Sequence, residues 1–355
     1  ADLRNRSGEE VIRWLHDLAT SLNVARGGRG RGSGEAAMAI DRACTRIEVD
    51  GDARARRDAL IDAGRCFGAV SIFDRAKEAF DQAEKLAGRD DQALRRVLMA
   101  RVEVARRSGE FGEAAEILSR LEPLVAAEKS NPAELYEVLV GLGSATSAVG
   151  GDGARDRAIA YLDRAEAITA RIGDNPARKV DRLKSRMLAF FFAGDFKHAA
   201  ETCERIIEIT REAGLVFESG IAFHNLGDAK IRLGEHAAAY AALQQSLALA
   251  EEGGHERLAA INRAPIAYLD GIAGDPQGQL RLAEIAAWNH GRGYQWDELN
   301  ARYWLGLLQV AKRNRLAAVE ELNLARGLAQ KLTMKSMVAD CDEALEAARR
   351  LPNDT

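Results

Sequence analysis

Apolar side chains recur along most of the chain at intervals of three and four residues, which is the spacing of one face of an α-helix. The segments with this pattern come in pairs, and a short turn separates the two members of each pair. No run rich in Val, Ile and Thr alternates with period two, so the sequence predicts no strand. Ala, Leu, Arg and Glu dominate, and the 355 residues include only 6 prolines. We therefore predict an all-α protein.

The paired segments repeat with a period near 40 residues. One residue after each turn, usually alanine, opens the same motif, and we call these residues the anchor positions: Ala76, Ala114, Ala158, Ala199, Ala239, Gln279 and Ala318. Successive anchors are 38, 44, 41, 40, 40 and 39 residues apart. A bulky residue generally follows the anchor by four positions and a small or apolar one by seven. A period of this length is typical of a helical repeat protein.

Glycines occupy two kinds of place in this pattern. Gly234 stands in the turn of its repeat, where a left-handed backbone ends the first helix of a pair. Gly227 falls inside the first helix, where glycine costs about 1 kcal/mol relative to alanine. We predict that Gly227 faces the neighbouring helix and allows the two backbones to approach closely, which offsets that cost.

The pattern resembles the tetratricopeptide repeat, in which Trp/Leu-x2-Leu-Gly-x2-Tyr in a first helix precedes Ala-x3-large-x2-small in a second. Two segments carry the resemblance best, through Leu60, Ala63, Gly64, Phe67, Ala76, Phe80 and Ala83 and through Phe223, Leu226, Gly227, Ala239, Leu243 and Ser246. The period near 40 exceeds the family's usual 34 and is similar to the longer subtype of kinesin light chains and bacterial signalling proteins. The resemblance implies a right-handed α-solenoid.

The sequence predicts three regions. Residues 1–50 form a degenerate helical pair, 7–25 and 35–48, joined by a Gly/Arg-rich loop at 26–34; residues 57–330 hold seven repeats; and residues 331–355 form a capping helix, 333–349, with a tail. The loop lacks the Lys-Ser/Thr and the preceding strand of a phosphate-binding loop, so a linker is favoured over that interpretation and over a short RNA-binding segment.

Local signals refine the repeats. Asn131-Pro132 and Asn175-Pro176 each place an N-cap residue before a proline at the first helical position. The insertion VGGDGARDRA lengthens the turn of the third repeat. Pro265 falls where the first helix of the sixth repeat should run, so a kink or a late start is expected there.

Charge and motif content exclude several classes. The net charge is -4 with both signs interleaved, which argues against a nucleic-acid partner. No apolar run approaches the roughly 20 residues of a membrane span, and no signal peptide opens the chain, so a cytoplasmic protein is expected. The scattered Cys44, Cys66, Cys203 and Cys341 are predicted to be small buried hydrophobes. No catalytic motif, metal site or cofactor site is recognised, so a non-enzyme is predicted.

The resemblance places candidate binding residues on the first helices, which line the concave face of such solenoids. After the tryptophan-like Phe223, the concave positions are His224, Asn225 and Asp228. In the kinesin-light-chain-like subtype the Asn of an Asn-Leu-Ala/Gly triplet hydrogen-bonds a bound peptide, and Asn225-Leu226-Gly227 matches it. The alternative is that Asn225 only supports contacts between helices. The other concave candidates have mixed charge: Arg65, Glu103, Arg106, Lys184 and Ser185.

Trp296, Tyr303 and Trp304 are seven and eight residues apart, so they share one helix face. Core packing between the sixth and seventh repeats is favoured, and an aromatic hot spot for a partner is the alternative.

These features predict a non-catalytic module that binds a protein or peptide partner in its concave groove. Because the chain begins with Ala1 and has long repeats of a bacterial type, we expect the regulatory or sensor region of a larger bacterial signalling protein, such as a Ser/Thr kinase or a STAND-type ATPase. The alternatives are a small-molecule-sensing repeat domain and a stand-alone assembly scaffold; a hydrolase is the least favoured class. Dimerisation through the solenoid ends is a further expectation.

Overall fold

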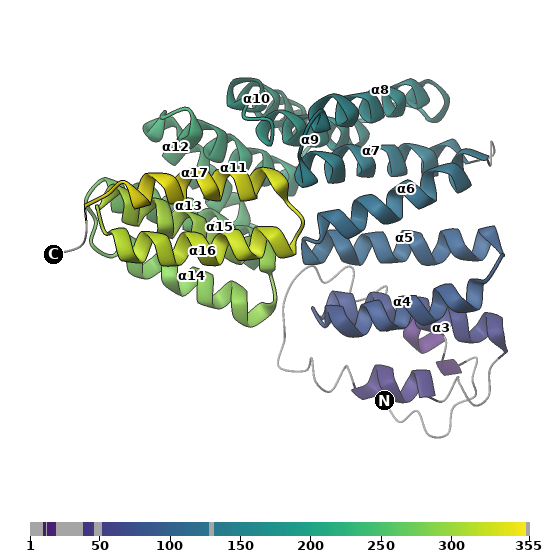
Figure 1. Ribbon diagram of the computed structural model, residues 1–355. Helices are drawn as coiled ribbons and strands as arrows, with labels where there is room; N and C mark the ends of the chain where they lie inside the picture. Colours follow the sequence, from purple (N-terminus) through teal and green to yellow (C-terminus); the bar gives the residue numbers. More distant parts are fainter. Residues whose placement is uncertain (1–9, 12, 19–37, 46–51, 128–130, 353–355) are drawn as a thin grey trace. The chain divides into compact units, whose positions relative to one another are not determined.

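The computed structural model describes residues 10–11, 13–18, 38–45, 52–127 and 131–352 (Figure 1). Over these residues every regular element is a helix, which confirms the all-α solenoid class. Helical residues at 10–11, 13–18 and 38–45 precede the following helices: α3 Ala53–Ala69, α4 Phe73–Ala87, α5 Asp91–Ser108, α6 Phe111–Ala127, α7 Pro132–Val149, α8 Ala154–Ile172, α9 Pro176–Phe191, α10 Phe196–Glu212, α11 Val216–Arg232, α12 His236–Glu252, α13 Glu256–Ile272, α14 Gly278–Arg292, α15 Gln295–Ala311, α16 Arg315–Lys331 and α17 Lys335–Arg349.

The helices form two compact units, residues 1–128 and 129–355, which we call the N-terminal and the C-terminal unit. Within each unit an odd-numbered first helix packs against the even-numbered second helix that follows it, and the pairs then stack. The predicted regions 1–50, 57–330 and 331–355 follow the repeats and not these two units, and they stay a prediction.

In several of the described pairs a glycine of the first helix lets the two helices approach closely. A Cβ atom added at Gly227 would lie 2.5 Å from Leu243 Cγ on α12, and one at Gly306 would lie 2.6 Å from Leu322 Cγ on α16. Leu243 and Leu322 are fully buried. The predicted role of Gly227 is therefore confirmed: it makes room for the bulky residue that its own second helix inserts.

The anchor positions are buried, except in the sixth repeat. Gln279 is exposed, and Gly278 takes the buried anchor position instead. A Cβ atom at Gly278 would lie 2.6 Å from the backbone oxygen of Ala267 on α13, so the contact admits only glycine. Leu282, four residues on, is fully buried and fills the bulky position. The prediction was one residue out of register because glycine replaces the expected alanine.

Turns and caps explain where the helices begin and end. Asn131 Oδ1 accepts from the Glu134 amide at 3.2 Å, and Asn175 Oδ1 accepts from the Arg178 amide at 2.9 Å, which confirms both predicted N-caps. Gly234 has φ 76°, the left-handed backbone expected after α11. The expected late start of the sixth repeat is wrong: α13 begins at Glu256, in phase with its neighbours, and runs on through the buried Pro265.

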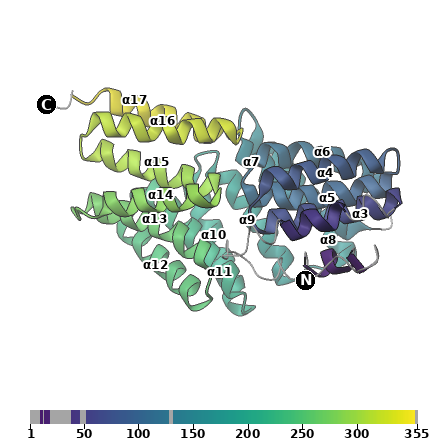
Figure 2. The same cartoon turned by 90° about the horizontal axis from the view of Figure 1, so that it is seen from below.

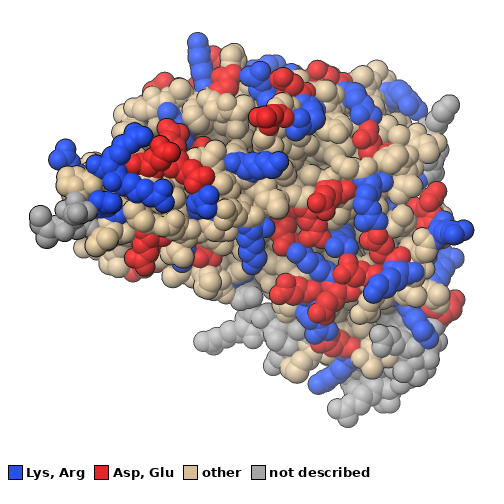
Figure 3. All heavy atoms as spheres, in the orientation of Figure 1, with Lys and Arg blue, Asp and Glu red and all other residues tan. Residues whose placement is uncertain are grey.

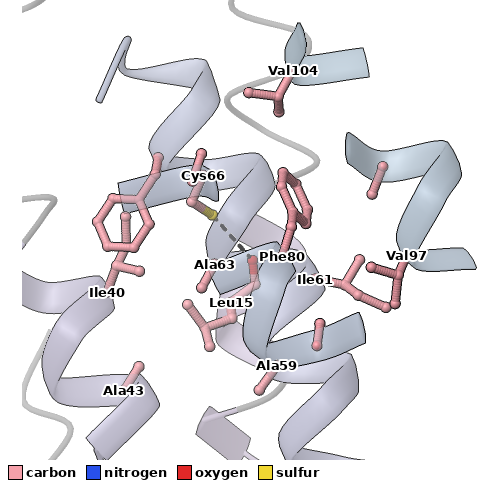
Figure 4. Close-up of a cluster of buried hydrophobic side chains, with 14 of the residues drawn as sticks. Leu15, Ile40, Ala43, Ala59, Ile61, Ala63, Cys66, Phe80, Val97 and Val104 are labelled. Atoms are coloured by element: carbon pink, nitrogen blue, oxygen red, sulfur yellow. Dashed lines mark hydrogen bonds between the residues drawn. The ribbon is translucent and has the colours of Figure 1, made fainter. Parts of the chain in front are cut away.

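The N-terminal unit has a continuous apolar core (Figure 4). Leu15 and Ile40, from the two helical stretches before α3, pack with Ala63 and Cys66 of α3 and with Phe80 of α4. The Cys66 thiol donates to the Leu15 backbone oxygen at 3.7 Å. The described parts of the predicted helices 7–25 and 35–48 are thus helical, whereas their remaining residues and the loop 26–34 lie outside the described residues.

The C-terminal unit closes on itself. The first helices α7, α9, α11, α13 and α15 pack one against the next, and α17 continues the stack beside α16 (Figures 1 and 2). α17 also contacts α7, at the other end of the unit. At this junction a Cβ atom on Gly150 would lie 3.1 Å from the Ser336 backbone nitrogen. The first helices therefore surround an interior, and we call their facing sides the inner face.

Charged side chains of both signs are interspersed over the face of the molecule seen in Figure 3. Ion pairs link neighbouring helices in this way; Lys77, for example, lies 2.6 Å from Glu110 and 3.2 Å from Glu113. In the described chain no helix combines the length and the apolar run needed to cross a bilayer.

Candidate functional site at the inner face of the C-terminal unit

Side chains from distant repeats meet at the inner face. Arg232 at the end of α11 donates to Asp340 of α17 at 2.7 Å, although 108 residues separate them. Its guanidinium group also lies 5.1 Å from the ring centre of Tyr303 on α15. The ring of Phe192, just after α9, meets the ring of Trp296 on α15 at 6.2 Å. The interior is therefore partly filled by the protein's own side chains.

A buried hydrogen-bond network fixes His224 on α11. The amide nitrogen of Asn262 on α13 donates to Ser246 Oγ and to the Leu258 backbone oxygen, both at 2.8 Å. Asn262 Oδ1 must then be an acceptor, and it lies 3.1 Å from His224 Nδ1. His224 Nδ1 therefore carries a proton and donates to Asn262. In the neutral imidazole the other nitrogen, Nε2, is consequently an acceptor.

Asp228 lies one turn along α11 from His224. Its Oδ2 is 3.7 Å from His224 Nε2, which is too long for a direct hydrogen bond. Its Oδ1 is buried and has no hydrogen-bond partner within the described structure. Burial raises the pKa of the Asp228 carboxyl, and the nearby His224 and Arg232 offset only part of this rise. A carboxylate held in this way is costly unless something compensates its charge.

His224 and Asp228 line a small cavity of about 40 Å³ together with residues of α13, α14 and α15. The other lining residues are Ile261, Ala264, Ile285, Asn289, Trp296, Asp297, Asn300 and Trp304. Asn289 is 1% exposed, and its Oδ1 also has no hydrogen-bond partner among the described residues. His224 and Asp228 of the predicted concave residues, and Trp296 and Trp304 of the aromatic group, thus meet at one cavity.

The three aromatic residues have different surroundings. Tyr303 and Trp304 are each 4% exposed, and Trp304 packs on Tyr268 with ring centres 5.0 Å apart. Core packing therefore describes these two residues. Trp296 is half-buried, at the wall of the cavity. Of the three, Trp296 is the most exposed.

The remaining predicted residues of the C-terminal unit differ in their burial and in their hydrogen-bond and ionic partners. Asn225 is half-buried on α11, and no described residue hydrogen-bonds its side chain. Lys184 on α9 pairs with Asp181 on the same helix at 2.8 Å. Ser185 is 2% exposed, and its Oγ lies 2.5 Å from Ser144 Oγ of α7. Ser185 thus joins two first helices and presents no free hydroxyl.

Arg65, Glu103 and Arg106 belong to the N-terminal unit. Arg65 on α3 lies 3.6 Å from Asp62 and 3.8 Å from Glu103 on α5. Arg106 is exposed in the last turn of α5. These three residues form a separate charged surface, and their predicted binding role stays a prediction.

A second hollow, which the sequence analysis did not predict, lies over α12, α13 and α14. This groove has a volume of about 700 Å³ and lining residues that include Ala259, Arg263, Arg281 and Trp288. The Arg292 guanidinium group stacks over the Trp288 ring at 3.9 Å. No local motif marks this groove, because its walls come from three helices whose spacing only the fold defines.

Other chemistry is sparse. Among the described side chains no group of three His, Cys, Asp or Glu residues is arranged to hold a metal ion. Cys66, Cys203 and Cys341 are buried, as predicted, whereas Cys44 is half-buried.

No protein-family model and no curated protein matches the chain. Solved structures do. A Rap protein complexed with competence and sporulation factor matches with a TM-score of 0.58 and 11% identity over 97% of this chain and 98% of its own. Aspartyl phosphate phosphatase F from Bacillus subtilis matches with a TM-score of 0.51 and 11% identity over 97% of this chain and 94% of its own.

A third match is a signal transduction ATPase with numerous domains (STAND) and a tetratricopeptide repeat sensor, from Pyrococcus horikoshii. Its TM-score is 0.52 and its identity 15%, over 99% of this chain and 51% of its own, so the chain spans about half the length of that protein. A sensor and a phosphatase share this architecture, so function has to be argued from the site. The chain has the fold of the tetratricopeptide-type helical repeat proteins.

Proposed function

We propose that the chain is a non-catalytic interaction module that binds a peptide or protein partner at the inner face of its C-terminal unit. The observation that carries this proposal is the set of polar groups left without partners at this face and in the cavity beside it. Asp228 Oδ1 and Asn289 Oδ1 are buried and unpaired, and the Asn225 amide is half-buried and unpaired among the described residues. Buried polar groups are normally hydrogen-bonded, so these groups are acceptors and donors available to a bound partner.

The chemistry of Asn225 suits an extended peptide. A side-chain amide can donate to a carbonyl and accept from an N–H group at once, which matches one peptide unit. Trp296 on the neighbouring wall adds an aromatic surface of the kind that anchors interfaces. The similar Rap protein was crystallised with competence and sporulation factor, which supports, by analogy of fold, a partner of this type.

We further propose that this module is the regulatory or sensor part of a larger bacterial signalling protein, with a Ser/Thr kinase or a STAND-type ATPase as the effector. The similar STAND protein carries its tetratricopeptide repeats as a sensor, and this chain corresponds to about half of its length. Partner binding would then shift the population of effector states by its differential affinity for them.

The test is a selection of peptides from a displayed random library on the immobilised chain, followed by calorimetry with the selected peptides. Asn225→Ala is expected to weaken binding about tenfold, the effect of losing one or two hydrogen bonds. Gln244→Ala is the matched control, because Gln244 is an exposed amide on the second helix α12. Failure to recover any peptide, or equal affinities for Asn225→Ala and Gln244→Ala, would refute the proposal.

One observation favours a second candidate, a small-molecule sensor. The groove over α12, α13 and α14 has a volume of about 700 Å³, within the range typical of ligand pockets. A thermal-shift screen with small anions and aromatic compounds, repeated on Arg263→Ala and Trp288→Ala, separates this function from peptide binding, because neither residue lies at the inner face.

A further inference from the structure

We propose that the cavity beside Asp228 is a binding site for one primary ammonium group, supplied by the N-terminus or by a lysine side chain of a peptide. This inference deepens the proposed function and rests on it for the identity of the ligand as a peptide. The geometry of the acceptors, the charge balance, the wall of the cavity and its access each support it.

Two residues that line the cavity carry unpaired acceptor oxygens. Asp228 Oδ1 and Asn289 Oδ1 are both buried, and neither has a hydrogen-bond partner in the described structure. They come from different helices, α11 and α14, and line the same cavity. His224 Nε2 adds a third acceptor, since Nδ1 of the same ring donates to Asn262. A primary ammonium group has three N–H donors and no acceptor, which matches this set.

The two facing atoms of His224 and Asp228 also favour an ammonium group as the ligand. His224 Nε2 and Asp228 Oδ2 are 3.7 Å apart, and in the neutral histidine both are acceptors that cannot satisfy each other. A hydrogen-bond donor bound beside them would give each of the two acceptors a partner. A group with one N–H donor would hydrogen-bond only one or two of these acceptors, whereas an ammonium group has one donor each for Asp228, Asn289 and His224.

The charge balance calls for one positive charge. Two carboxylates line the cavity, but Asp297 Oδ2 is bound by Arg257 Nε at 2.6 Å. Arg232, one turn beyond Asp228, is bound to Asp340. Of the two carboxylates, Asp228 therefore has as its nearest ionic contact only His224 Nε2, which lies 3.7 Å from its Oδ2. A buried carboxylate is stabilised strongly by a charge-assisted hydrogen bond from a cation.

The walls and size of the cavity favour a small organic cation. Trp296 and Trp304 line it beside Ile261, Ala264 and Ile285, and a cation near an indole ring gains a further electrostatic attraction. A cavity of about 40 Å³ exceeds the roughly 10–15 Å³ that one water needs. It admits an ammonium group with its first methylene carbon, and it is small for a planar guanidinium group.

The site can be reached from the inner face. The side chains of His224 and Asp228 are 15% and 19% exposed. Asn225, the proposed contact for a peptide backbone, is adjacent in sequence to His224 and is also half-buried. A peptide held by Asn225 could therefore place its terminal amine, or a lysine, against Asp228.

The experiment titrates the full chain with n-butylammonium chloride and follows tryptophan fluorescence and heat of binding. Two probes control for size and charge: n-butanol has no charge, and tetramethylammonium has charge but no N–H donor. We expect saturable binding of n-butylammonium in the millimolar range, and binding of either control probe at least about tenfold weaker.

Variants locate the site. Asp228→Asn keeps the shape and removes the charge, and it should weaken n-butylammonium binding about tenfold or more. Asn289→Ala removes a second acceptor and should weaken it severalfold. The matched control is Asp163→Asn on α8, where the carboxylate is 61% exposed and pairs with Arg186; it should bind as the wild type does. Circular dichroism verifies that each variant is folded.

Peptide arms distinguish the two sources of the ammonium group. Peptides selected in the test above are compared with a free and an acetylated N-terminus, and with each lysine replaced by norleucine. The modification that weakens binding to the wild type, but not to Asp228→Asn, identifies the source.

Three results would overturn the ammonium site: equal binding of n-butanol, equal loss in Asp228→Asn and Asp163→Asn, or a crystal soaked with n-butylammonium in which only water occupies the cavity. If the selected peptides bind regardless of acetylation, lysine content and Asp228→Asn, the ammonium site fails and the interaction module stands. If n-butylammonium binds as expected but no peptide is recovered, the site stands and the proposed function fails.

Discussion

Replacing Gly227 by alanine tests how the helix pairs of this protein are held together. The added Cβ atom would lie 2.5 Å from Leu243 Cγ, 2.7 Å from Leu243 Cδ2 and 3.4 Å from the Ala239 backbone oxygen. Contacts of 2.5 and 2.7 Å are far inside van der Waals separation, so α11 and α12 must separate or Leu243 must leave its rotamer. Leu243 is fully buried in the core, so neither adjustment is free.

The magnitude follows from two opposing terms. Overpacking a well-packed site costs typically 1–3 kcal/mol, whereas replacing glycine by alanine inside a helix gains about 1 kcal/mol. Gly327 on α16 isolates the second term, because an added Cβ there meets nothing within 4 Å. Gly327→Ala should therefore stabilise the protein by about 1 kcal/mol. Gly227→Ala should be less stable than Gly327→Ala by about 1–3 kcal/mol.

The assay is equilibrium urea denaturation followed by far-ultraviolet circular dichroism, with hydrogen exchange of α11 and α12 as a local measure. Local exchange is needed because a repeat protein can unfold in parts. The double variant Gly227→Ala with Leu243→Ala tests the mechanism further. The new methyl group then occupies space that the leucine vacated, so the double variant should be more stable than the sum of the single effects predicts.

Two results would refute the close-packing account. The first is equal stabilisation by Gly227→Ala and Gly327→Ala, which would mean that the glycine is present for a reason other than packing. The second is strict additivity in the double variant, which would mean that Gly227 and Leu243 do not compete for the same space.

Three further predictions follow from single residues. Asp228→Asn should raise the melting temperature at neutral pH, because burial raises the pKa of the folded carboxyl above its ordinary value of 3.8. The ionised form is disfavoured in the folded state, so the wild type loses stability as the pH rises through the folded pKa. The gain from the variant should therefore vanish as the pH falls below 3.8, where the carboxyl is protonated in both the folded and the unfolded state. Melting curves of the variant and the wild type across this range measure the effect, and a gain that persists at low pH would contradict it. Asn175→Ala should cost about 1 kcal/mol, because the N-cap acceptor for the Arg178 amide is lost; urea denaturation measures this, and an unchanged midpoint would contradict it. Burial raises the pKa of Cys66 and Cys341 to about 12 and also raises that of Cys203, so an aromatic disulfide reagent at mildly alkaline pH should modify these three thiols only after the protein is unfolded, as mass spectrometry of the native and unfolded chains can determine.

The helix pairs were predictable because each carries its own local signals. Proline after asparagine marks the start of α7 and of α9, and both asparagines act as N-caps. Gly227 and Leu243, 16 positions apart in the sequence, are in contact because one short turn joins their helices. Such contacts depend on short sequence separations, which a periodic pattern records directly.

The register of the sixth repeat was missed for a physical reason. An anchor position requires a small side chain, and the sequence offers Gly278 next to Gln279. The expected period favoured Gln279, whereas the 2.6 Å approach to the Ala267 oxygen selects glycine. Here the periodicity located the anchor position only to within one residue, and packing selected Gly278 over Gln279.

The candidate site was predictable only in part. The repeat pattern identified His224 and Asp228 as candidate binding residues. It could not show that they line the same cavity as Trp296. The pairing of Arg232 with Asp340 over 108 residues, and the contact of α17 with α7, depend on how far the stack curves. Curvature accumulates from small rotations at every repeat, and no single residue in the sequence encodes it. The same limit explains why a shared helix face did not distinguish the buried Tyr303 and Trp304 from the more accessible Trp296.

Hydrogen–deuterium exchange of the full chain, with and without a peptide selected on it, shows which helices a bound partner covers. If the inner face binds the peptide, exchange should slow in α11 and α15, the helices that carry Asn225, Asp228 and Trp296, and should not change in the second helices α12 and α16. Protection confined to α12 and α16, or to the N-terminal unit, would contradict the assignment of the inner face as the binding surface.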